Sequence, residues 1–226
     1  MSEVAILEVL GETLLLHPER AVIWQSHRTI IVADTHFGKS AIFGQHGVAT
    51  PAGSDDQDRQ RLTRLVIESE AHQLIVLGDF VHSALAVDSQ EARDLEEWSS
   101  SLRPAVVQVI VGNHDRGIAK FCCPSVQWLE EDKIELPFRF THDAAKIVRS
   151  DKKLFTLSGH IHPVVRLKGL RKTPLRVPVF WKHSGGLILP SFGVFTGGFI
   201  VTPAYGDQIF AVSPDRVVPF PVQTGR

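Results

Sequence analysis

The strongest constraint on the fold of this sequence is a set of five short hydrophobic segments, each followed directly by polar side chains. The segments end at Ala33, Leu77, Val111, Thr141 and Ser158, and an aspartate, asparagine or histidine follows each within two residues. Such aliphatic and aromatic runs are typical of buried strands. In an open sheet, functional groups gather beyond the carboxyl ends of the strands. The sequence therefore predicts a polar site at one edge of a buried sheet.

The first half of the chain alternates predicted strands with predicted helices. One helix is expected to begin at a capping box of Ser54 and Gln57. A second is expected to begin with Asp88 and Glu91 and to end before Pro104. The predicted inner faces of these helices carry Leu62, Leu65, Val66, Leu95, Trp98 and Leu102. The predicted strands of this half are residues 5–10, 13–16, 21–24, 29–33, 73–77 and 106–111.

The second half of the chain consists mainly of predicted strands. These are residues 134–141, 154–158, 164–167, 177–181 and 209–212. We find no internal repeat and no linker rich enough to divide the chain. The expected architecture is a single α/β domain over residues 1–226, in which mixed sheets pack on each other with helices outside.

The composition narrows the choice of function and location. The formal net charge of −1 removes any global electrostatic argument for nucleic-acid binding, although a local basic patch remains possible. No apolar run is long enough to span a membrane, and the first residues lack the features of a signal peptide. Cys122 and Cys123 are adjacent, too close for a relaxed disulfide, so we expect free thiols in a reducing cytoplasm.

The polar clusters differ in how specifically they indicate a site. Asp34-Thr35-His36 or Gly78-Asp79 alone would suit an ordinary turn or helix cap. The sequence GNHD from Gly112 is more specific, because a turn has no use for the histidine. The sequence GHIH from Gly159 places two imidazoles on the same side of an extended segment. Together with eleven histidines in the chain, these clusters predict a metal site.

In this order, DTH, GDFVH, GNHD, the lone His142 and GHIH resemble the five sequence blocks of the calcineurin-like metallophosphoesterases. The segments VADTHFGKS, GVATPAG from Gly47, SGHIHP and VFWKHSGGLILPSFGVFTGG from Val179 further resemble the bacterial DNA-ligase-associated phosphoesterases, the PdeM family. This resemblance covers roughly residues 25 to 202. It implies a metallophosphoesterase-type sandwich of two mixed β-sheets flanked by helices.

The resemblance also implies two divalent metal ions, about 3.5–4 Å apart, that clamp a phosphoryl substrate and activate a water molecule. Asp79 would bridge them, since a carboxylate offsets the repulsion between two cations. One ion would take Asp34, His36, Asp79 and His162, and the other would take Asp79, Asn113, His142 and His160. This mixture of ligands suits Mn²⁺, Fe, Zn²⁺ or Ni²⁺, and Mn²⁺ is the expectation from the family.

Two further histidines are catalytic candidates. The resemblance makes His114 the residue that protonates the leaving oxygen or stabilises the transition state, with packing beneath the loop as the alternative. His82 departs from the Gly-Asp-x-x-Asp-Arg-Gly block of the protein phosphatases and is similar to a nuclease branch of the superfamily. A second imidazole would suit a phosphodiester with an alkoxide leaving group, although His82 could simply orient His114. We interpret His17, His27, His46, His72 and His183 as surface or packing residues.

A basic segment follows GHIH. Between Arg166 and Lys182 the chain carries no acidic residue, and its basic residues are Arg166, Lys168, Arg171, Lys172, Arg176 and Lys182. This segment would bind the phosphates of a nucleic-acid backbone. Alternatively, it is a solvated loop whose positive charge is offset by the acidic residues of the two predicted helices. Phe180 and Trp181 are expected to pack in the core rather than to stack on bases.

The leading hypothesis is a dinuclear metal-dependent phosphodiesterase that cuts single-stranded or gapped DNA, as an endonuclease in DNA repair. The resemblance implies a DNA ligase and associated repair proteins as partners. One alternative is a phosphodiesterase or phosphatase that acts on small nucleotides, for which the basic segment would be unimportant. Another is a non-catalytic metallophosphoesterase-like scaffold, which the full set of predicted ligands disfavours.

Overall fold

The computed structural model describes residues 3–39, 54–83, 85–86, 88–116, 122–149, 153–167, 174–194 and 196–221. Several sequence features lie outside this part of the chain: the GVATPAG segment, His46, the side chain of Ser54 in the predicted capping box, and the basic residues Lys168, Arg171 and Lys172. Among the described helices, none combines the length and the hydrophobicity that crossing a membrane requires.

The first sheet, sheet I, is assembled in the order of the sequence. Its first four strands are antiparallel neighbours, and from β4 onward each strand runs parallel to the next. The carboxyl ends of β4, β5 and β6 therefore open onto the same edge. The strands are β1 (Ala5–Val9), β2 (Glu12–His17), β3 (Ala21–Trp24), β4 (Thr29–Val32), β5 (Gln73–Val76), β6 (Val106–Ile110) and β7 (Gln127–Leu129).

The second sheet, sheet II, has the strand order β14-β11-β12-β13-β10-β9-β8, with β15 paired to β12 and β16 paired to β15. Strands β9, β10 and β13 are parallel, whereas β11 and β12 form an antiparallel pair. The strands are β8 (Lys133–Glu135), β9 (Phe138–Thr141), β10 (Phe155–Ser158), β11 (Pro163–Leu167), β12 (Leu175–His183), β13 (Gly186–Ile188), β14 (Phe199–Ile200), β15 (Gln208–Val212) and β16 (Val217–Phe220).

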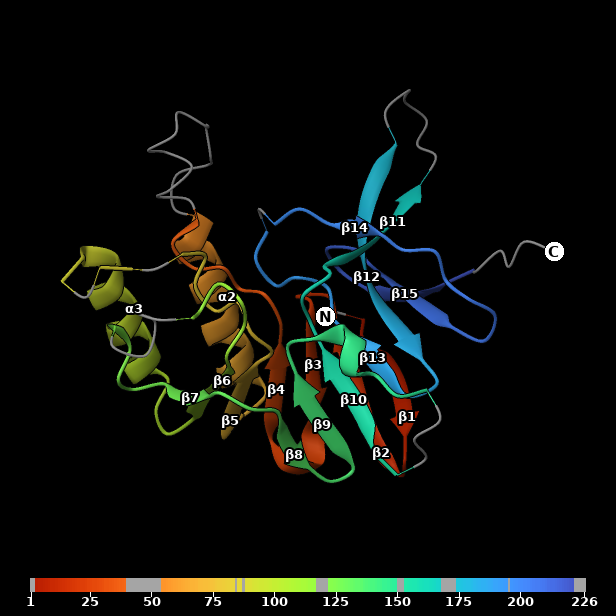
Figure 1. The fold of residues 1–226 in the computed structure, drawn as a ribbon, viewed down its shortest axis with the longest axis horizontal. Helices are drawn as coiled ribbons and strands as arrows, with labels where there is room; N and C mark the ends of the chain where they lie inside the picture. Colours follow the sequence, from red (N-terminus) through yellow and green to blue (C-terminus); the bar gives the residue numbers. More distant parts are fainter. Residues whose placement is uncertain are drawn as a thin grey trace.

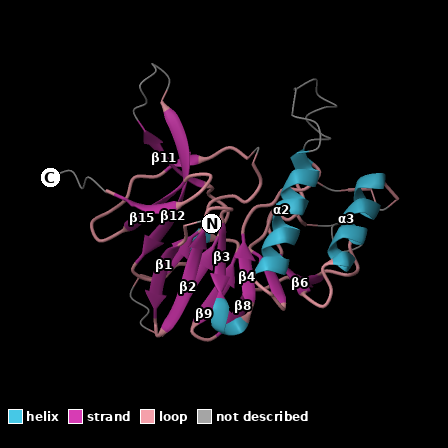
Figure 2. Cartoon of the chain, turned by 180° about the vertical axis from the view of Figure 1, so that it is seen from behind, coloured by secondary structure: helices cyan, strands magenta, loops and turns pink. Residues whose placement is uncertain are grey.

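Two α-helices, α2 (Ser54–Glu68) and α3 (Gln90–Ser101), lie on one face of sheet I, while sheet II lies against the other (Figures 1 and 2). Leu62, Leu65 and Leu95 are buried against sheet I as predicted. Two short 3₁₀-helices, η1 (Gln25–His27) and η2 (Ala144–Lys146), occur in the connections. The predicted two-sheet α/β architecture with outer helices is confirmed.

Strand β4 shows why the hydrophobic runs do not alternate between apolar and polar residues, as a strand with one exposed face would. All four of its residues are buried, because it lies in the middle layer of the molecule. Ile30 and Val32 belong to the core beneath the helices, whereas Ile31 belongs to the core between the sheets. Trp24 and Phe138 meet edge to face in that inter-sheet core, with ring centroids 4.8 Å apart.

Some predicted boundaries are wrong for identifiable reasons. The strand expected over residues 134–141 is two antiparallel strands, β8 and β9, because the chain turns at Leu136-Pro137 and proline interrupts a strand ladder. The second helix begins at Gln90, because Ser89 and not Asp88 is its cap: the Ser89 hydroxyl accepts a hydrogen bond from the Ala92 amide at 3.1 Å.

Candidate metal centre

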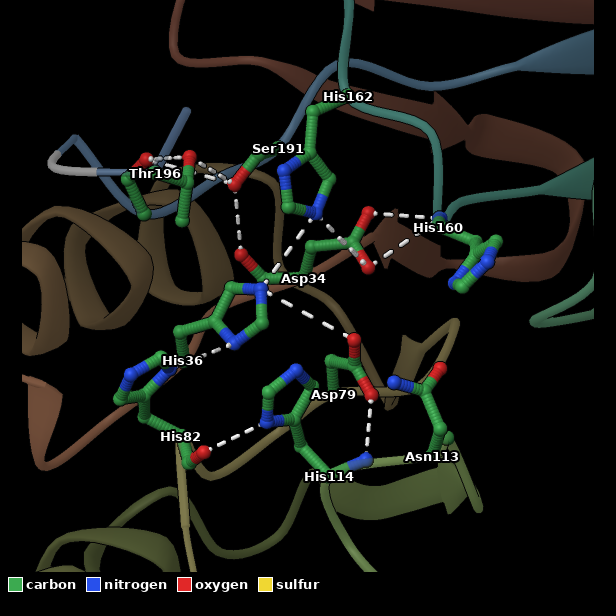
Figure 3. A network of polar contacts seen from close by, with 12 residues as sticks. Asp34, His36, Asp79, His82, Asn113, His114, His160, His162, Ser191 and Thr196 are labelled. Carbon is green, nitrogen blue, oxygen red and sulfur yellow. Dashed lines mark hydrogen bonds and ion pairs between the residues drawn. The ribbon is translucent and has the colours of Figure 1, made fainter. Parts of the chain in front are cut away.

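The structure brings the predicted site residues together at the edge where the strands of both sheets end (Figure 3). Sheet I supplies six of them, in three loops that follow β4, β5 and β6, and sheet II supplies three, from the ends of β9 and β10. Polar contacts link all of them into one network. The residues are Asp34, His36, Asp79, His82, Asn113, His114, His142, His160 and His162.

The first group of potential ligands consists of Asp34, His36 and His162, whose ligand atoms all lie within 4.8 Å of one another. Nε2 of His162 is 3.5 Å from Oδ1 of Asp34 and 3.4 Å from Nε2 of His36. Asp34 is fully buried, and its carboxylate also accepts a hydrogen bond from the His160 amide at 2.9 Å. Two imidazoles and one carboxylate thus face a common point.

The second group consists of Asp79, His142 and His160, which satisfy the same distance limit. Nε2 of His142 is 3.0 Å from Nδ1 of His160 and 2.9 Å from Oδ1 of Asn113. The carboxamide oxygen of Asn113 is therefore placed to join this group. Its four members are the residues that the family resemblance assigns to the second ion.

The carboxylate of Asp79 lies between the two groups. Its Oδ2 is 3.9 Å from Nε2 of His36, and its Oδ1 is 3.6 Å from Nε2 of His142. The backbone amide of His114 donates a hydrogen bond to Oδ1 at 2.9 Å, which fixes the carboxylate in this orientation. One oxygen thus faces each group, which is the arrangement that a bridging ligand requires.

Backbone carbonyls set the orientation of two imidazole rings. Nδ1 of His142 donates a hydrogen bond to the Leu77 carbonyl at 2.9 Å, and Nδ1 of His162 donates to the Gly197 carbonyl at 3.2 Å. Because a carbonyl can only accept, each Nδ1 carries a hydrogen and each Nε2 faces the centre. Metal-binding histidines commonly have such a hydrogen bond on the ring nitrogen that does not bind the ion.

Burial and charge set the protonation states at the first group. Burial, followed by the neighbouring His162 and Lys39, lowers the pKa of His36 to about 2, so its imidazole is neutral. At His162 burial lowers the pKa, but the hydrogen bond and charge of Asp34 outweigh burial, so the net pKa is raised. Neutral imidazoles and carboxylates bind divalent transition metals. The donor set fits such ions.

The backbone is strained at many of these residues. Nine non-glycine residues in the described chain have positive φ, and five of them are predicted ligands. A positive φ is uncommon outside glycine and costs free energy, and such residues cluster at functional sites. The five are Asp34 at 54°, His36 at 49°, Asp79 at 48°, His160 at 76° and His162 at 48°.

Two glycines leave the space that the ligands occupy. A Cβ atom at Gly112 would come closer than 3.0 Å to the Asp79 amide and carboxylate, and one at Gly78 would overlap the ring of His142. Gly78 also has a φ of +77°. The glycine before each predicted ligand in GDFVH and GNHD is therefore required, because it packs closely against another predicted ligand.

The sequence of the chain matches a known protein family. The profile of the calcineurin-like phosphoesterase family matches residues 27–196. The chain belongs to this family. It is therefore a phosphoester hydrolase that uses divalent metal ions, as the resemblance of the sequence blocks predicted.

One solved structure resembles the phosphoesterase over nearly its whole length. The nuclease MPE of Pseudomonas putida is 32% identical, with 96% of this chain and 100% of that chain covered and a TM-score of 0.80. The phosphoesterase YfcE of E. coli is 14% identical, with 84% and 96% covered and a TM-score of 0.48. Comparison with curated protein sequences returned no match.

His82 and His114 lie beside the first group of the phosphoesterase. Nδ1 of His114 donates a hydrogen bond to the backbone carbonyl of His82 at 2.7 Å, and the two rings stack with centroids 5.2 Å apart. Nδ1 of His82 is 3.5 Å from Nδ1 of His36. His114 is exposed, so it does not pack beneath its loop.

Sequence reasoning assigned no role to Asp115 or to the motif around Ser191. Asp115 is buried, and its carboxylate accepts hydrogen bonds from the amides of Val81 and Gly112, which ties the loops after β5 and β6 together. The Ser191 hydroxyl donates to the Asp34 carbonyl at 2.8 Å and so supports the strained turn of that ligand. Asp115 belongs to GNHD and Ser191 belongs to LPSFGVFTGG. Membership of these motifs is the only sequence signal that could have indicated a role for either residue.

The described part of the basic segment does not form one patch. Arg166 and Arg176 are exposed one residue from the end of the β11–β12 pair, where Leu167 faces Leu175, whereas Lys182 lies near the other end of β12, opposite Leu187 and Gln208. Phe180 is fully buried, as expected. His183 is also buried, where its Nδ1 lies 3.2 Å from Asp207, in accord with a packing role.

Proposed function

We propose that this phosphoesterase is a dinuclear metal-dependent phosphodiesterase that cuts single-stranded or gapped DNA. The observation that carries the proposal is the carboxylate of Asp79, which turns one oxygen to each group of ligands. A single ion would need only one such group. Two groups joined by one carboxylate suit the pair of ions that clamps a phosphodiester.

We assign the ligands to two ions. Asp34, His36, Asp79 and His162 would hold one ion, and Asp79, Asn113, His142 and His160 would hold the other. When bound, the ions would polarise the phosphoryl group and activate water for attack on phosphorus. The mixture of imidazole, carboxylate and carboxamide donors favours Mn²⁺, Fe, Zn²⁺ or Ni²⁺ over Mg²⁺ or Ca²⁺, and we propose Mn²⁺.

His114 is the proposed general acid. Its Nδ1 is engaged by the His82 carbonyl, so Nε2 is the atom that can give a proton to the leaving oxygen. When the bond between phosphorus and the leaving oxygen breaks in DNA, a strongly basic alkoxide would form unless it receives a proton. We propose that His82 acts at the same position, through the ring that stacks on His114.

Two observations support DNA rather than a small ester as substrate. The structural relative with 32% identity is a nuclease. In addition, Asn113, His114 and His160 are exposed, so the centre is open to a polymer rather than enclosed. The further proposals of a role in DNA repair and a DNA ligase as partner rest on the sequence resemblance alone. A cytoplasmic location is proposed from Cys122 and Cys123, which are free thiols.

The test compares cleavage of labelled single-stranded DNA with hydrolysis of bis-p-nitrophenyl phosphate, both with Mn²⁺. The variants are His114→Ala and Asp79→Asn, and the matched control is His72→Ala, an exposed histidine outside the network. Wild type and His72→Ala should cut both substrates, and Asp79→Asn should cut neither. Hydrolysis of the small diester alone by the wild type would favour the nucleotide-directed enzyme. Failure on both substrates with metal bound would favour the scaffold.

A further inference from the structure

Two arginines face each other directly across the β11–β12 pair. Arg166 and Arg176 are Cα partners in this antiparallel ladder, so their side chains lie on the same face of the sheet. Like charges in this position repel each other and weaken the pairing. Both residues are exposed, and within the described ranges neither guanidinium has an ion pair. Strands β11 and β12 themselves contain no acidic residue.

The arginine pair lies on the face of β12 that packs against sheet I lower on the strand. Side chains two and four residues apart on a strand share a face, so Arg176 is on the same face as Phe180. Phe180 packs in the core between the two sheets. Above that core the β11–β12 pair extends beyond the two layers (Figure 1). The face that is buried lower down is therefore open at the level of Arg176.

A short path of contacts connects the pair to His162. Nη1 of Arg176 is 3.5 Å from the Gly198 carbonyl, and the preceding carbonyl, Gly197, accepts the hydrogen bond from His162. Arg166, in β11, follows His162 by four residues, which corresponds to roughly 13 Å of extended chain. A single DNA strand carries one phosphate on every nucleotide, so a strand bound at the centre can also reach the arginine pair.

From this geometry we infer that Arg166 and Arg176 form a phosphate track that holds a single DNA strand beside the cleavage site. This inference rests on the proposed function and names the residues that engage the polymer. Each guanidinium presents a planar fork of donors that matches phosphate oxygens. A polyanion on this face also offsets the repulsion between the two arginines. The track contacts the backbone and not the bases, so it contributes affinity without sequence preference.

The test is the salt dependence of DNA binding. Labelled oligothymidylate is titrated with the Mn²⁺-loaded His114→Ala protein by fluorescence anisotropy, between about 50 and 200 mM salt. The same measurement is made after adding Arg166→Gln and Arg176→Gln together. The matched control adds Arg28→Gln and Arg103→Gln, which removes the same charge. These two exposed arginines precede β4 and β6, at the opposite end of sheet I from the site.

On a single strand, each phosphate contact contributes about 0.7 to the slope of log K against log salt concentration. The track predicts that the slope falls by about 1.4 in the Arg166/Arg176 variant, with affinity at least roughly ten-fold weaker at the lowest salt. The control should keep the slope of the parent. Thermal unfolding should show that the Tm of the Arg166/Arg176 variant is not below that of the parent. If it does not fold, Arg166→Gln alone should lower the slope by about half as much.

Different results would contradict the phosphate track and the proposed nuclease function. An unchanged slope in the Arg166/Arg176 variant, while wild type cuts single-stranded DNA, overturns the track and leaves the nuclease assignment intact. An equal loss in the control variant also overturns it, because net charge alone would then explain the effect. If wild type neither binds nor cuts single-stranded DNA but hydrolyses the small diester, the proposed function fails and the track fails with it.

Discussion

The backbone carbonyl of His82 accepts a hydrogen bond from Nδ1 of His114 at 2.7 Å, while the ring of His82 stacks on that of His114. The carbonyl determines which nitrogen of His114 faces the substrate, and any residue at position 82 would supply it. The side chain of His82 is therefore not needed for the hydrogen bond that Nδ1 of His114 makes. This allows the two histidines to be tested independently.

His114→Ala should affect the two kinds of substrate differently. General acid catalysis contributes about 10²- to 10⁴-fold when the leaving oxygen is strongly basic, so DNA cleavage should fall by that order. A p-nitrophenolate leaving group needs little protonation, so hydrolysis of bis-p-nitrophenyl phosphate should fall much less. Steady-state rates of wild type and variant on both substrates give the loss on DNA relative to the loss on the small diester. An equal loss on both would assign His114 to metal binding or to the fold.

A double variant tests whether His82 acts through His114. If the ring of His82 only positions His114, then His82→Ala combined with His114→Ala should cut DNA no more slowly than His114→Ala alone. If His82 contacts the substrate independently, the losses should multiply. Single-turnover DNA cleavage by the four proteins completes this cycle. Metal content, measured for each protein, shows whether His36, next to His82, still holds its ion.

Gly112→Ala should lower the metal content of the chain. The added methyl group would overlap the Asp79 amide and carboxylate, which would displace the proposed bridge. We expect metal content near two ions per chain in the wild type and a clear loss in the variant. Gly197→Ala is the matched control, since an added Cβ there meets nothing within 4 Å and alanine keeps the backbone carbonyl that accepts the hydrogen bond from His162. Elemental analysis after gel filtration measures both, and full occupancy in Gly112→Ala would contradict the proposed role of Asp79.

Cys123 should be inert to alkylation in the folded protein. Burial, followed by the neighbouring Cys122 and Glu96, raises the pKa of the Cys123 thiol to about 12. The reactive thiolate is then scarce below that pH and rises only as pH approaches it. Iodoacetamide at pH 8, followed by peptide mass spectrometry, should modify Cys123 slowly in the folded chain and fully in denaturant. Rapid modification of the folded chain would show that the thiol is accessible.

Asp115→Ala should destabilise the fold without removing a ligand. The carboxylate accepts hydrogen bonds from the buried amides of Val81 and Gly112, and the variant leaves these donors unpaired. An unsatisfied buried donor costs about 1–3 kcal/mol, so the free energy of unfolding should fall by at least that amount. Urea unfolding measures it. A variant as stable as wild type would show that water replaces the carboxylate.

The candidate site was predictable because its signals are local. Each predicted ligand lies within four residues of the end of a strand whose hydrophobic run is visible in the sequence, and parallel pairing of β4, β5 and β6 brings three of these ends together. The register of sheet II was less predictable. Its short strands β13 and β14 follow from long-range pairing with β10 and β11, which no local pattern encodes. Lys182 and Arg176 are likewise far apart because both lie on the single long strand β12, whose length was not predicted.

Each proposed ion takes ligands from both layers of the molecule. Asp34 and His36 leave sheet I to meet His162 from sheet II, and Asp79 leaves sheet I to meet His142 and His160 from sheet II. Elsewhere the two sheets are held together mainly by apolar side chains, a contact that has no preferred direction. Coordination bonds are directional. An ion in either group would therefore serve as a cross-link that fixes the registry of one sheet over the other, in the way that a disulfide fixes two strands.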